Sequence, residues 1–439
     1  MTRLSSPFLS IAARLPARGR AFPLGPLARG FGAMGSAEMV SRLVRLATTV
    51  VIARQLAPEI VGQAALALTL FELVRVLERT GTGQEIIRAA PEDLARTCNG
   101  VRQFYVAWSG ALMLLQLLVA AALGALFGHR TAALMLAALA FVWPFMAMGH
   151  VSYFLILRDR RAGRVASINA SQVIADQLLT AALLLAWPSP WSIVLPKLLT
   201  APLWLAMARR AAPWRFDPAA GCLPFAAILR NASRYLLADG FAAVRTYGDN
   251  LIVAATMGTT ALGTYYFAFN AGLGIVTSLV GAYCTIAFPT LCAASEGDER
   301  RAAMRRIGAG AALVFVPLVG AQALLAPLYV PLVFGAHWAF AAPLIATLCL
   351  AGLPLAASML TATWLRAHGR VGTDAIASMG ACAAALGGLA IGASFGSLQA
   401  AVVGLVAGQA LASAFYAGRI LWPVLFTREN PTLLKEQIA

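Results

Sequence analysis

Arginines inside long apolar segments are the residues of this chain best suited to binding chemistry. Arg42 and Arg45 are three residues apart, so they share one face of a helix. Arg75 lies three residues from both Glu72 and Glu78. A guanidinium group presents planar, bidentate donors that match phosphate oxygens, and it keeps its charge when partly buried. The sequence therefore predicts an anion-binding site formed by Arg42, Arg45, Arg75 and Arg245.

Carboxylates in the same segments offer a second kind of chemistry, the binding of a proton or another coupling cation. A charge at mid-bilayer costs at least ~2.5 kcal/mol, so such a group must face a cavity or an opposite charge. The alternative is neutralisation in ion pairs, which the spacing of Glu72 with Arg75 and of Arg245 with Asp249 permits. The predicted ion-coupling residues are, in order of preference, Asp249, Asp239 and Asp176.

Twelve apolar stretches position these groups, and each is near the ~20 residues that a helix needs to cross a bilayer. Composition agrees, because 60% of the residues are hydrophobic and only 12% are charged, which excludes a soluble globule. We predict an all-α polytopic membrane protein with about 12 transmembrane helices. The predicted spans are residues 32–53, 62–83, 103–127, 131–157, 165–187, 191–209, 233–257, 262–289, 304–326, 337–361, 372–394 and 399–423.

Basic residues alternate between the gaps that separate these spans. Nearly all of the arginines outside the spans fall in the N-terminal segment and in the even-numbered gaps, as Arg158, Arg160 and Arg161 do in the fourth gap. Arginine bias in short loops sets topology, so both termini and the even gaps are predicted to be cytoplasmic. The net charge of +16 is thus dispersed over loops, which argues against a nucleic-acid partner and for contact with anionic membrane lipids.

Several other classes of function lack support in the sequence. The external gaps are too short for a catalytic domain, so we expect a protein that is not an enzyme. No GxxxxGK[ST] segment is present for nucleotide binding. The six cysteines form no CxxC pair and the four histidines are scattered, so we predict no metal site, disulfide framework or cofactor.

An internal repeat divides the chain into two halves. Gly62 aligns with Gly263 and Ala67 with Ala268 around two short turns, each early in a set of six spans. Because six is even, both halves have the same orientation, and a pseudo-two-fold axis along the membrane normal should relate them. We expect a disordered basic cytoplasmic tail (1–31), an N-terminal six-helix lobe (32–209), a cytoplasmic interfacial linker (210–232), a C-terminal six-helix lobe (233–425) and a cytoplasmic tail (426–439).

The linker carries Trp214 and Phe216 on either side of Arg215, a pattern typical of a segment that lies in the membrane interface. The first tail is rich in arginine and has no acid, as in an organellar transit peptide. Its prolines disfavour the long amphipathic helix that such a peptide needs, so we favour a retained tail over a cleaved targeting segment.

Short motifs at the turns resemble those of a known family. The run Ala53–Gly62 reads A-R-x-L-x-P-x-x-x-G, and downstream come Asp249, Gly258 and then Leu262-Gly263-x-Tyr265. Pro289 and the run Val333-Phe334-Gly335-x-x-Trp338 follow in the same order as in that family. The chain resembles the Wzx-type polysaccharide and O-antigen flippases of the multidrug/oligosaccharidyl-lipid/polysaccharide exporter superfamily over about residues 32–425.

This resemblance implies two six-helix lobes around a central cavity that works by alternating access. The substrate would be a polyprenyl-diphosphate-linked oligosaccharide, flipped to the outer leaflet for cell-surface polysaccharide assembly, with its diphosphate on the arginine cluster. The implied setting is the bacterial cytoplasmic (inner) membrane, as a monomer that works with polysaccharide polymerase machinery. The alternative is a cation-coupled multidrug exporter of the same superfamily, whose cavity would be acidic and aromatic rather than rich in arginine.

Overall fold

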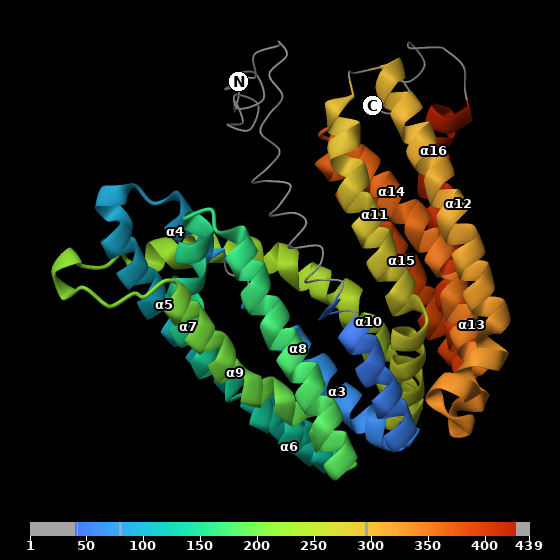
Figure 1. Cartoon of the computed structure of the whole chain (residues 1–439), viewed down its shortest axis with the longest axis horizontal. Coiled ribbons are helices and arrows are strands. Elements are labelled where there is room, and N and C mark those ends of the chain that lie inside the picture. Colours follow the sequence, from blue (N-terminus) through green and yellow to red (C-terminus); the bar gives the residue numbers. More distant parts are fainter. Residues whose placement is uncertain (1–39, 42, 79–80, 295–296, 427–439) are drawn as a thin grey trace.

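The computed structural model describes residues 40–41, 43–78, 81–294 and 297–426, which are almost entirely helical. Figure 1 shows two groups of helices that converge at one end of the molecule and diverge at the other. The first group is the N-terminal lobe, which runs from the first described helix to α9. The second is the C-terminal lobe, which runs from α10 to α16.

The N-terminal lobe opens with helical residues 43–55. Its further elements are α3 (Pro58–Val76), α4 (Thr82–Arg88), η1 (Pro91–Asp93), α5 (Leu94–Leu126), α6 (Arg130–Leu139), α7 (Val142–Arg158), α8 (Ala162–Ala186) and α9 (Trp191–Ala211). The short helix η2 (Pro218–Ala220) lies in the segment that leads to the other lobe.

The C-terminal lobe contains α10 (Phe225–Ala271), α11 (Leu273–Ala293), α12 (Asp298–Tyr329), η3 (Val330–Phe334), η4 (Ala336–Ala341), α13 (Ala342–Leu350), α14 (Gly352–Ala367), α15 (Val371–Ala393) and α16 (Leu398–Phe426). Helix α10 begins inside the range 210–232 that the sequence assigns to the linker. It changes direction sharply at Gly258, where φ is 82° and ψ is 179°. Only glycine adopts this backbone conformation readily, and the break separates the predicted seventh and eighth spans.

The prediction of an all-α membrane protein is confirmed. From residue 40 onward, the described residues of each predicted span are mostly helical, in one helix or in successive helices. Within the described residues, nine helices are long and apolar enough to cross a bilayer, and several of these combine neighbouring segments. Continuous helices such as Thr246–Ala293 therefore contain the end of one predicted span and the start of the next.

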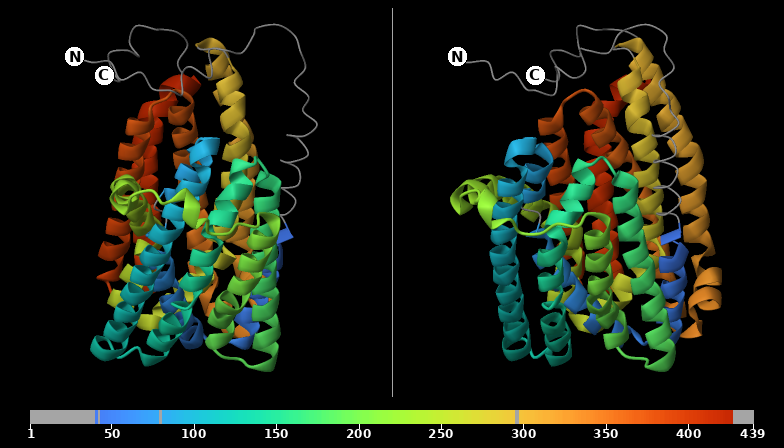
Figure 2. Two further views of the ribbon diagram at one scale, coloured as in Figure 1. Left: turned by 90° about the vertical axis from the view of Figure 1, so that its left-hand side faces the viewer. Right: turned by 60° about the vertical axis from the view of Figure 1, so that its left-hand side comes forward.

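The predicted external and cytoplasmic gaps lie at opposite ends of the bundle. The turns between α5 and α6 and between α8 and α9, both predicted to be external, lie at the converging end (Figure 2). Helix α4 and the segment between α9 and α10, both predicted to be cytoplasmic, lie toward the diverging end. The alternation of basic gaps in the sequence thus corresponds to two distinct ends of the molecule.

The converging end is closed by direct backbone contact between α3 and α10. A methyl group added at Gly62 would lie 1.8 Å from the Thr259 carbonyl oxygen, and one at Gly263 would lie 1.9 Å from the Pro58 carbonyl oxygen. The two glycines that align in the internal repeat therefore pack against each other across the lobes. We call this contact, with Gly62 and Gly263 at its centre, the interlobe seam.

Hydrogen bonds extend the interlobe seam beyond the glycines. The Arg54 guanidinium donates to the Val333 and Leu332 carbonyl oxygens, both at 2.9 Å. The Trp338 indole nitrogen donates to the Ala53 carbonyl oxygen at 2.7 Å. Both interactions join residues of the first helix to the turn that follows α12, so the motif residues identified in the sequence hold the lobes together at this end.

Small residues also bring α15 and α16 into close contact. A methyl group added at Gly404 would lie 2.0 Å from the Gly388 carbonyl oxygen, and one at Gly408 would lie 2.0 Å from the Ala384 carbonyl oxygen. Small residues spaced four apart let helix backbones approach closely in a membrane. This pairing helps to hold the C-terminal lobe as one unit.

Candidate functional site

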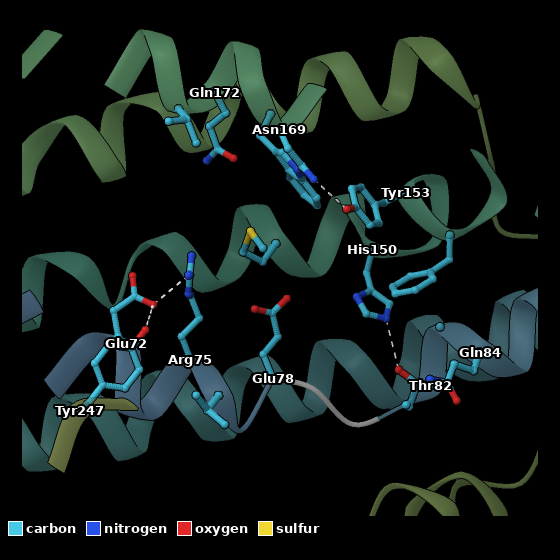
Figure 3. Close-up of a pocket in the computed structure, with 17 residues that line it drawn as sticks. Glu72, Arg75, Glu78, Thr82, Gln84, His150, Tyr153, Asn169, Gln172 and Tyr247 are labelled. Carbon is cyan, nitrogen blue, oxygen red and sulfur yellow. Dashed lines mark hydrogen bonds and ion pairs between the residues drawn. The ribbon is translucent and has the colours of Figure 1, made fainter. Parts of the chain in front are cut away.

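A cavity that includes predicted site residues has a volume of about 750 Å³ and lies mainly within the N-terminal lobe. Helices α3, α4, α7, α8 and α9 form its walls, and α10 contributes Tyr247. Figure 3 shows that Glu72, Arg75 and Tyr247 lie at one end and that His150 and Thr82 lie at the other. We call this space the lobe cavity.

A charged cluster occupies the first end of the lobe cavity. Arg75 pairs with Glu72 at 2.8 Å, as their i,i+3 spacing on α3 permits. The Tyr247 hydroxyl donates to the same carboxylate at 3.4 Å. The Arg75 side chain is 47% exposed and that of Glu72 is 16% exposed, so the guanidinium retains an open side toward the cavity.

Arg45 approaches this cluster from the first helix. Its charge and that of Glu72 both lie within electrostatic range of the Tyr266 hydroxyl. The Arg45 side chain is otherwise exposed. The first helix and α3 thus bring two of the predicted anion-binding arginines, Arg45 and Arg75, into the region around Glu72 and Tyr266.

A stacked aromatic network closes the other end of the lobe cavity. The Tyr105 hydroxyl donates to the Glu78 carboxylate, and the Tyr105 ring stacks on His150 with centroids 3.5 Å apart. His150 is buried and forms a 3.2 Å hydrogen bond with the Thr82 hydroxyl. Glu78 therefore has a buried hydrogen-bond partner on α5.

Amide and aromatic side chains line the wall between the two ends. The Asn169 amide donates to the Tyr153 hydroxyl at 3.0 Å, and the Tyr153 ring lies 5.6 Å from that of Trp204. Gln172 follows Asn169 by nearly one helical turn on α8 and faces the same space (Figure 3). Polar hydrogen-bonding groups beside aromatic faces suit the hydroxyls and apolar faces of sugar rings.

The side chains of three predicted site residues lie outside the described part of the structure. Arg42 lies outside the described residues, and the structure does not describe the side chains of Asp239 and Arg245. The predicted grouping of Arg42 and Arg245 with Arg45 and Arg75 therefore stays a prediction.

Asp249, the first ion-coupling candidate, lies on α10 before the break at Gly258. Its carboxylate accepts hydrogen bonds from the Tyr265 hydroxyl at 2.7 Å and from the Asn250 backbone amide at 2.8 Å. Tyr265 is fully buried on the other side of the break, so this bond joins the two halves of α10. The neighbouring Asn250 donates to the Thr69 hydroxyl of α3 at 3.2 Å.

Asp176 has a basic partner on the adjacent helix. Its carboxylate lies 3.7 Å from the Lys197 ammonium group of α9 and accepts from the Gln177 amide at 3.2 Å. The other carboxylate oxygen is buried and has no hydrogen-bond partner among the described residues. Asp176 therefore combines an ion pair with one unsatisfied oxygen. It is not among the residues that line the lobe cavity.

The side chains that the sequence did not single out are Tyr105, His150, Asn169 and Gln172. Asn169 and Gln172 carried a signal, because amides inside an otherwise apolar span require partners. The pairing of Tyr105 with Glu78 had no such signal, because Tyr105 lies on α5 and Glu78 in the turn after α3, and no local spacing relates them.

Comparisons with known proteins agree with this architecture. A family model described as polysaccharide biosynthesis protein matches residues 51–343, which is more than half of the chain. A comparison with curated protein sequences gave no significant match.

Three solved structures are similar over nearly the whole chain. An inward-facing multidrug resistance MATE family transporter of the MOP superfamily has a TM-score of 0.69 at 15% identity, and the alignment covers 91% of this chain and 96% of that one. The lipid II flippase MurJ, in an inward closed conformation, gives 0.70 at 13% identity, with 92% and 95% covered.

A MOP superfamily transporter from Pyrococcus furiosus, described as having a binding pocket of reversed polarity, gives a TM-score of 0.54 at 13% identity, with 91% and 94% covered. At these identities the three likenesses establish the fold. The family match and the fold together confirm the resemblance seen in the turn motifs. The chain therefore belongs to the polysaccharide biosynthesis protein family and has the fold of the multidrug/oligosaccharidyl-lipid/polysaccharide exporter superfamily.

Proposed function

We propose that this protein is a transporter that flips polyprenyl-diphosphate-linked oligosaccharide from the cytoplasmic to the outer leaflet by alternating access. The observation that carries the proposal is the composition of the lobe cavity. Arg75 stands at one end with Arg45 nearby, whereas Asn169, Gln172, Tyr153 and Trp204 line the wall beyond it. Such an arrangement suits a ligand with a phosphate group attached to sugars.

The charged end can accept an anion without losing its own ion pair. Arg75 uses one terminal nitrogen on Glu72 and is about half exposed, so its remaining donors are available to a diphosphate. Arg45 is exposed nearby and adds a second guanidinium. Bidentate contacts of this kind are strong and depend on geometry, which distinguishes arginine from lysine at the same position.

We propose that the converging end faces outward and that both chain termini are cytoplasmic, as the arginine bias of the gaps indicates. In this orientation the interlobe seam closes the outer side, and the lobes diverge toward the cytoplasm. The setting would be the bacterial inner membrane, where the protein would act as a monomer beside polysaccharide polymerase machinery. Outward movement of an anion there releases ~2.3 kcal/mol per charge per 100 mV.

A coupling cation would add to this driving force. Asp249 is our first candidate, because a carboxylate bonded to Tyr265 across the break of α10 changes surroundings whenever the two halves move. Asp239 and Asp176 follow, although the ion pair of Asp176 with Lys197 also fits a structural role.

A cation-coupled multidrug exporter is the second candidate. It is favoured by the two carboxylates, Glu72 and Glu78, and by the aromatic rings of Tyr153 and Trp204 on the lobe cavity. Such a lining suits an organic cation, which would displace Arg75 from Glu72. The substrate preference of an Arg75 variant separates the two candidates.

The test is complementation of a strain that lacks the gene. Wild-type protein should restore surface polysaccharide and clear the lipid-linked oligosaccharide that accumulates inside, whereas Arg75→Ala at equal membrane level should do neither. Arg130→Ala is the matched control, because this arginine begins α6 at the converging end, away from the lobe cavity. Full restoration by Arg75→Ala, together with increased sensitivity of the deletion strain to cationic drugs, would favour the exporter.

A further inference from the structure

A second pocket, of about 390 Å³, lies at the edge of the N-terminal lobe. It is formed by α5, α7, α9 and the segment after α9, and three arginines line it: Arg102, Arg209 and Arg215. Trp214 and Phe216 form its aromatic wall. Its volume falls in the ~300–1,000 Å³ range of small-ligand sites. We call it the linker pocket.

The linker pocket opens away from the lobe cavity. The lobe cavity is lined on α7 by Met146, His150, Tyr153 and Phe154, and the linker pocket by Ala147, Met148, Val151 and Ser152. With 3.6 residues per turn, these sets centre on opposite sides of α7. The segment between α9 and α10 projects from the outer side of the N-terminal lobe in Figure 1. The linker pocket therefore faces the surroundings of the lobe rather than the substrate path.

Its depth corresponds to the level of lipid headgroups. Helix α5 has 33 residues and ends at Leu126, and about 20 of them suffice to cross the hydrocarbon. Counting back from Leu126, the hydrocarbon ends near Val106, so Arg102 lies about one turn beyond it. Arg209 lies in the last turn of α9. Both arginines are thus at the membrane interface, on the side where the gaps are basic.

The three arginines retain donors for an anion. Arg102 lies over the Phe216 ring, with 5.6 Å from its guanidinium carbon to the ring centre. Arg209 donates a hydrogen bond only from its Nε, to the Met148 carbonyl oxygen at 3.3 Å. No carboxylate lines the pocket or forms an ion pair with these arginines in the described part of the chain. The nearby Asp217 instead accepts from the Ala219 amide.

The aromatic wall is held in place before any ligand arrives. Asn99 is fully buried on α5, and its amide donates to the carbonyl oxygens of Asp217 and Gly221 at 2.6 and 2.8 Å. The Leu223 amide donates to the Arg96 carbonyl oxygen at 3.3 Å. These bonds fix the chain that directly follows Arg215 and Phe216, which lowers the entropic cost of binding.

We propose that the linker pocket binds the phosphate of an anionic phospholipid headgroup from the leaflet that this end of the protein faces. Three guanidiniums supply bidentate donors to the phosphate oxygens, and the aromatic wall contacts the glycerol region. The bound lipid would anchor the connection between the two lobes at a fixed depth. This site is independent of the transported substrate.

Trp214 reports on the proposed site. Wild-type protein and the Trp214→Phe variant are placed in phosphatidylcholine vesicles that contain an increasing mole fraction of phosphatidylglycerol brominated near its chain carbonyls. The difference between their fluorescence signals gives the quenching of Trp214. Quenching should reach half its maximum at a low mole fraction of phosphatidylglycerol. The variant Arg102→Ala/Arg209→Ala/Arg215→Ala should require at least about tenfold more phosphatidylglycerol for half-maximal quenching. The corresponding lysine variant should require an intermediate amount.

The matched control removes three exposed arginines of the same end that do not line the pocket: Arg160, Arg164 and Arg210. It should shift the half-quenching point by less than about twofold, since it alters only general attraction to anionic lipid. An equal shift in both triple variants, or equal quenching by brominated phosphatidylcholine, would overturn the proposal. Reversal of quenching by millimolar inorganic phosphate would reassign the pocket to a soluble phosphate compound.

Discussion

Replacing Gly62 by alanine should open the interlobe seam. The added methyl group would lie 1.8 Å from the Thr259 carbonyl oxygen, whereas a comfortable contact needs about 3.5 Å. Helices α3 and α10 would have to separate by more than about 1.5 Å, which also disturbs the hydrogen bonds of Arg54 and Trp338. Overpacking of this kind costs ~1–3 kcal/mol, so the closed seam should become roughly 5- to 150-fold less favoured relative to open states.

The assay is the rate at which a thiol at the interlobe seam reacts in purified protein. Ala53→Cys in a cysteine-free background places the thiol at a fully buried position whose carbonyl oxygen accepts from Trp338. Gly62→Ala should accelerate its labelling within the range given above. Gly110→Ala is the control, because a methyl group added there has no neighbouring atom within 4 Å. Equal labelling rates in both variants would refute the argument that direct backbone contact closes this end.

Three further outcomes follow from the remaining contacts. Arg45→Ala and Arg75→Ala should each reduce polysaccharide export at least about tenfold at equal membrane level, with partial recovery on substitution by lysine. Unchanged export in the double alanine variant would remove the anion site. Asp249→Ala should abolish export, and adding Arg245→Ala should not restore it; recovered export would make Asp249 only a structural partner of that arginine. Gly404→Leu should lower the melting temperature by several degrees, because its side chain enters the Gly388 backbone, whereas Gly387→Leu at an open position should change it little.

Helix positions and local pairs were accessible from the sequence because they depend on composition and short spacings. The i,i+3 spacing of Glu72 and Arg75 permits an ion pair, and the structure contains it at 2.8 Å. Alignment of Gly62 with Gly263 identified two residues that prove to be in contact. Helical spacing relates the first pair, and alignment of the two repeats relates the second. Both relations can be found in the sequence without knowledge of the helix packing.

Partners that meet only through the fold were not accessible. The spacing of Asp249 and Arg245 permits an ion pair, but no spacing indicates the Tyr265 hydroxyl, which reaches Asp249 because the break at Gly258 brings the two halves of α10 side by side. The Glu78 carboxylate accepts from the Tyr105 hydroxyl of α5, which no sequence spacing relates to it. Helix packing selects these partners, and the residue pattern of one helix carries no information about it.

Translocation by the purified protein tests the central claim most directly. Proteoliposomes that contain fluorescent polyprenyl-diphosphate-linked oligosaccharide are treated with an impermeant reagent that destroys the label exposed on the outer leaflet. Wild-type protein should make nearly all of the label accessible within minutes, whereas Arg75→Ala should leave about half of it protected, as in vesicles without protein. Equal protection with and without wild-type protein, in vesicles that still transport an organic cation, would contradict the flippase account.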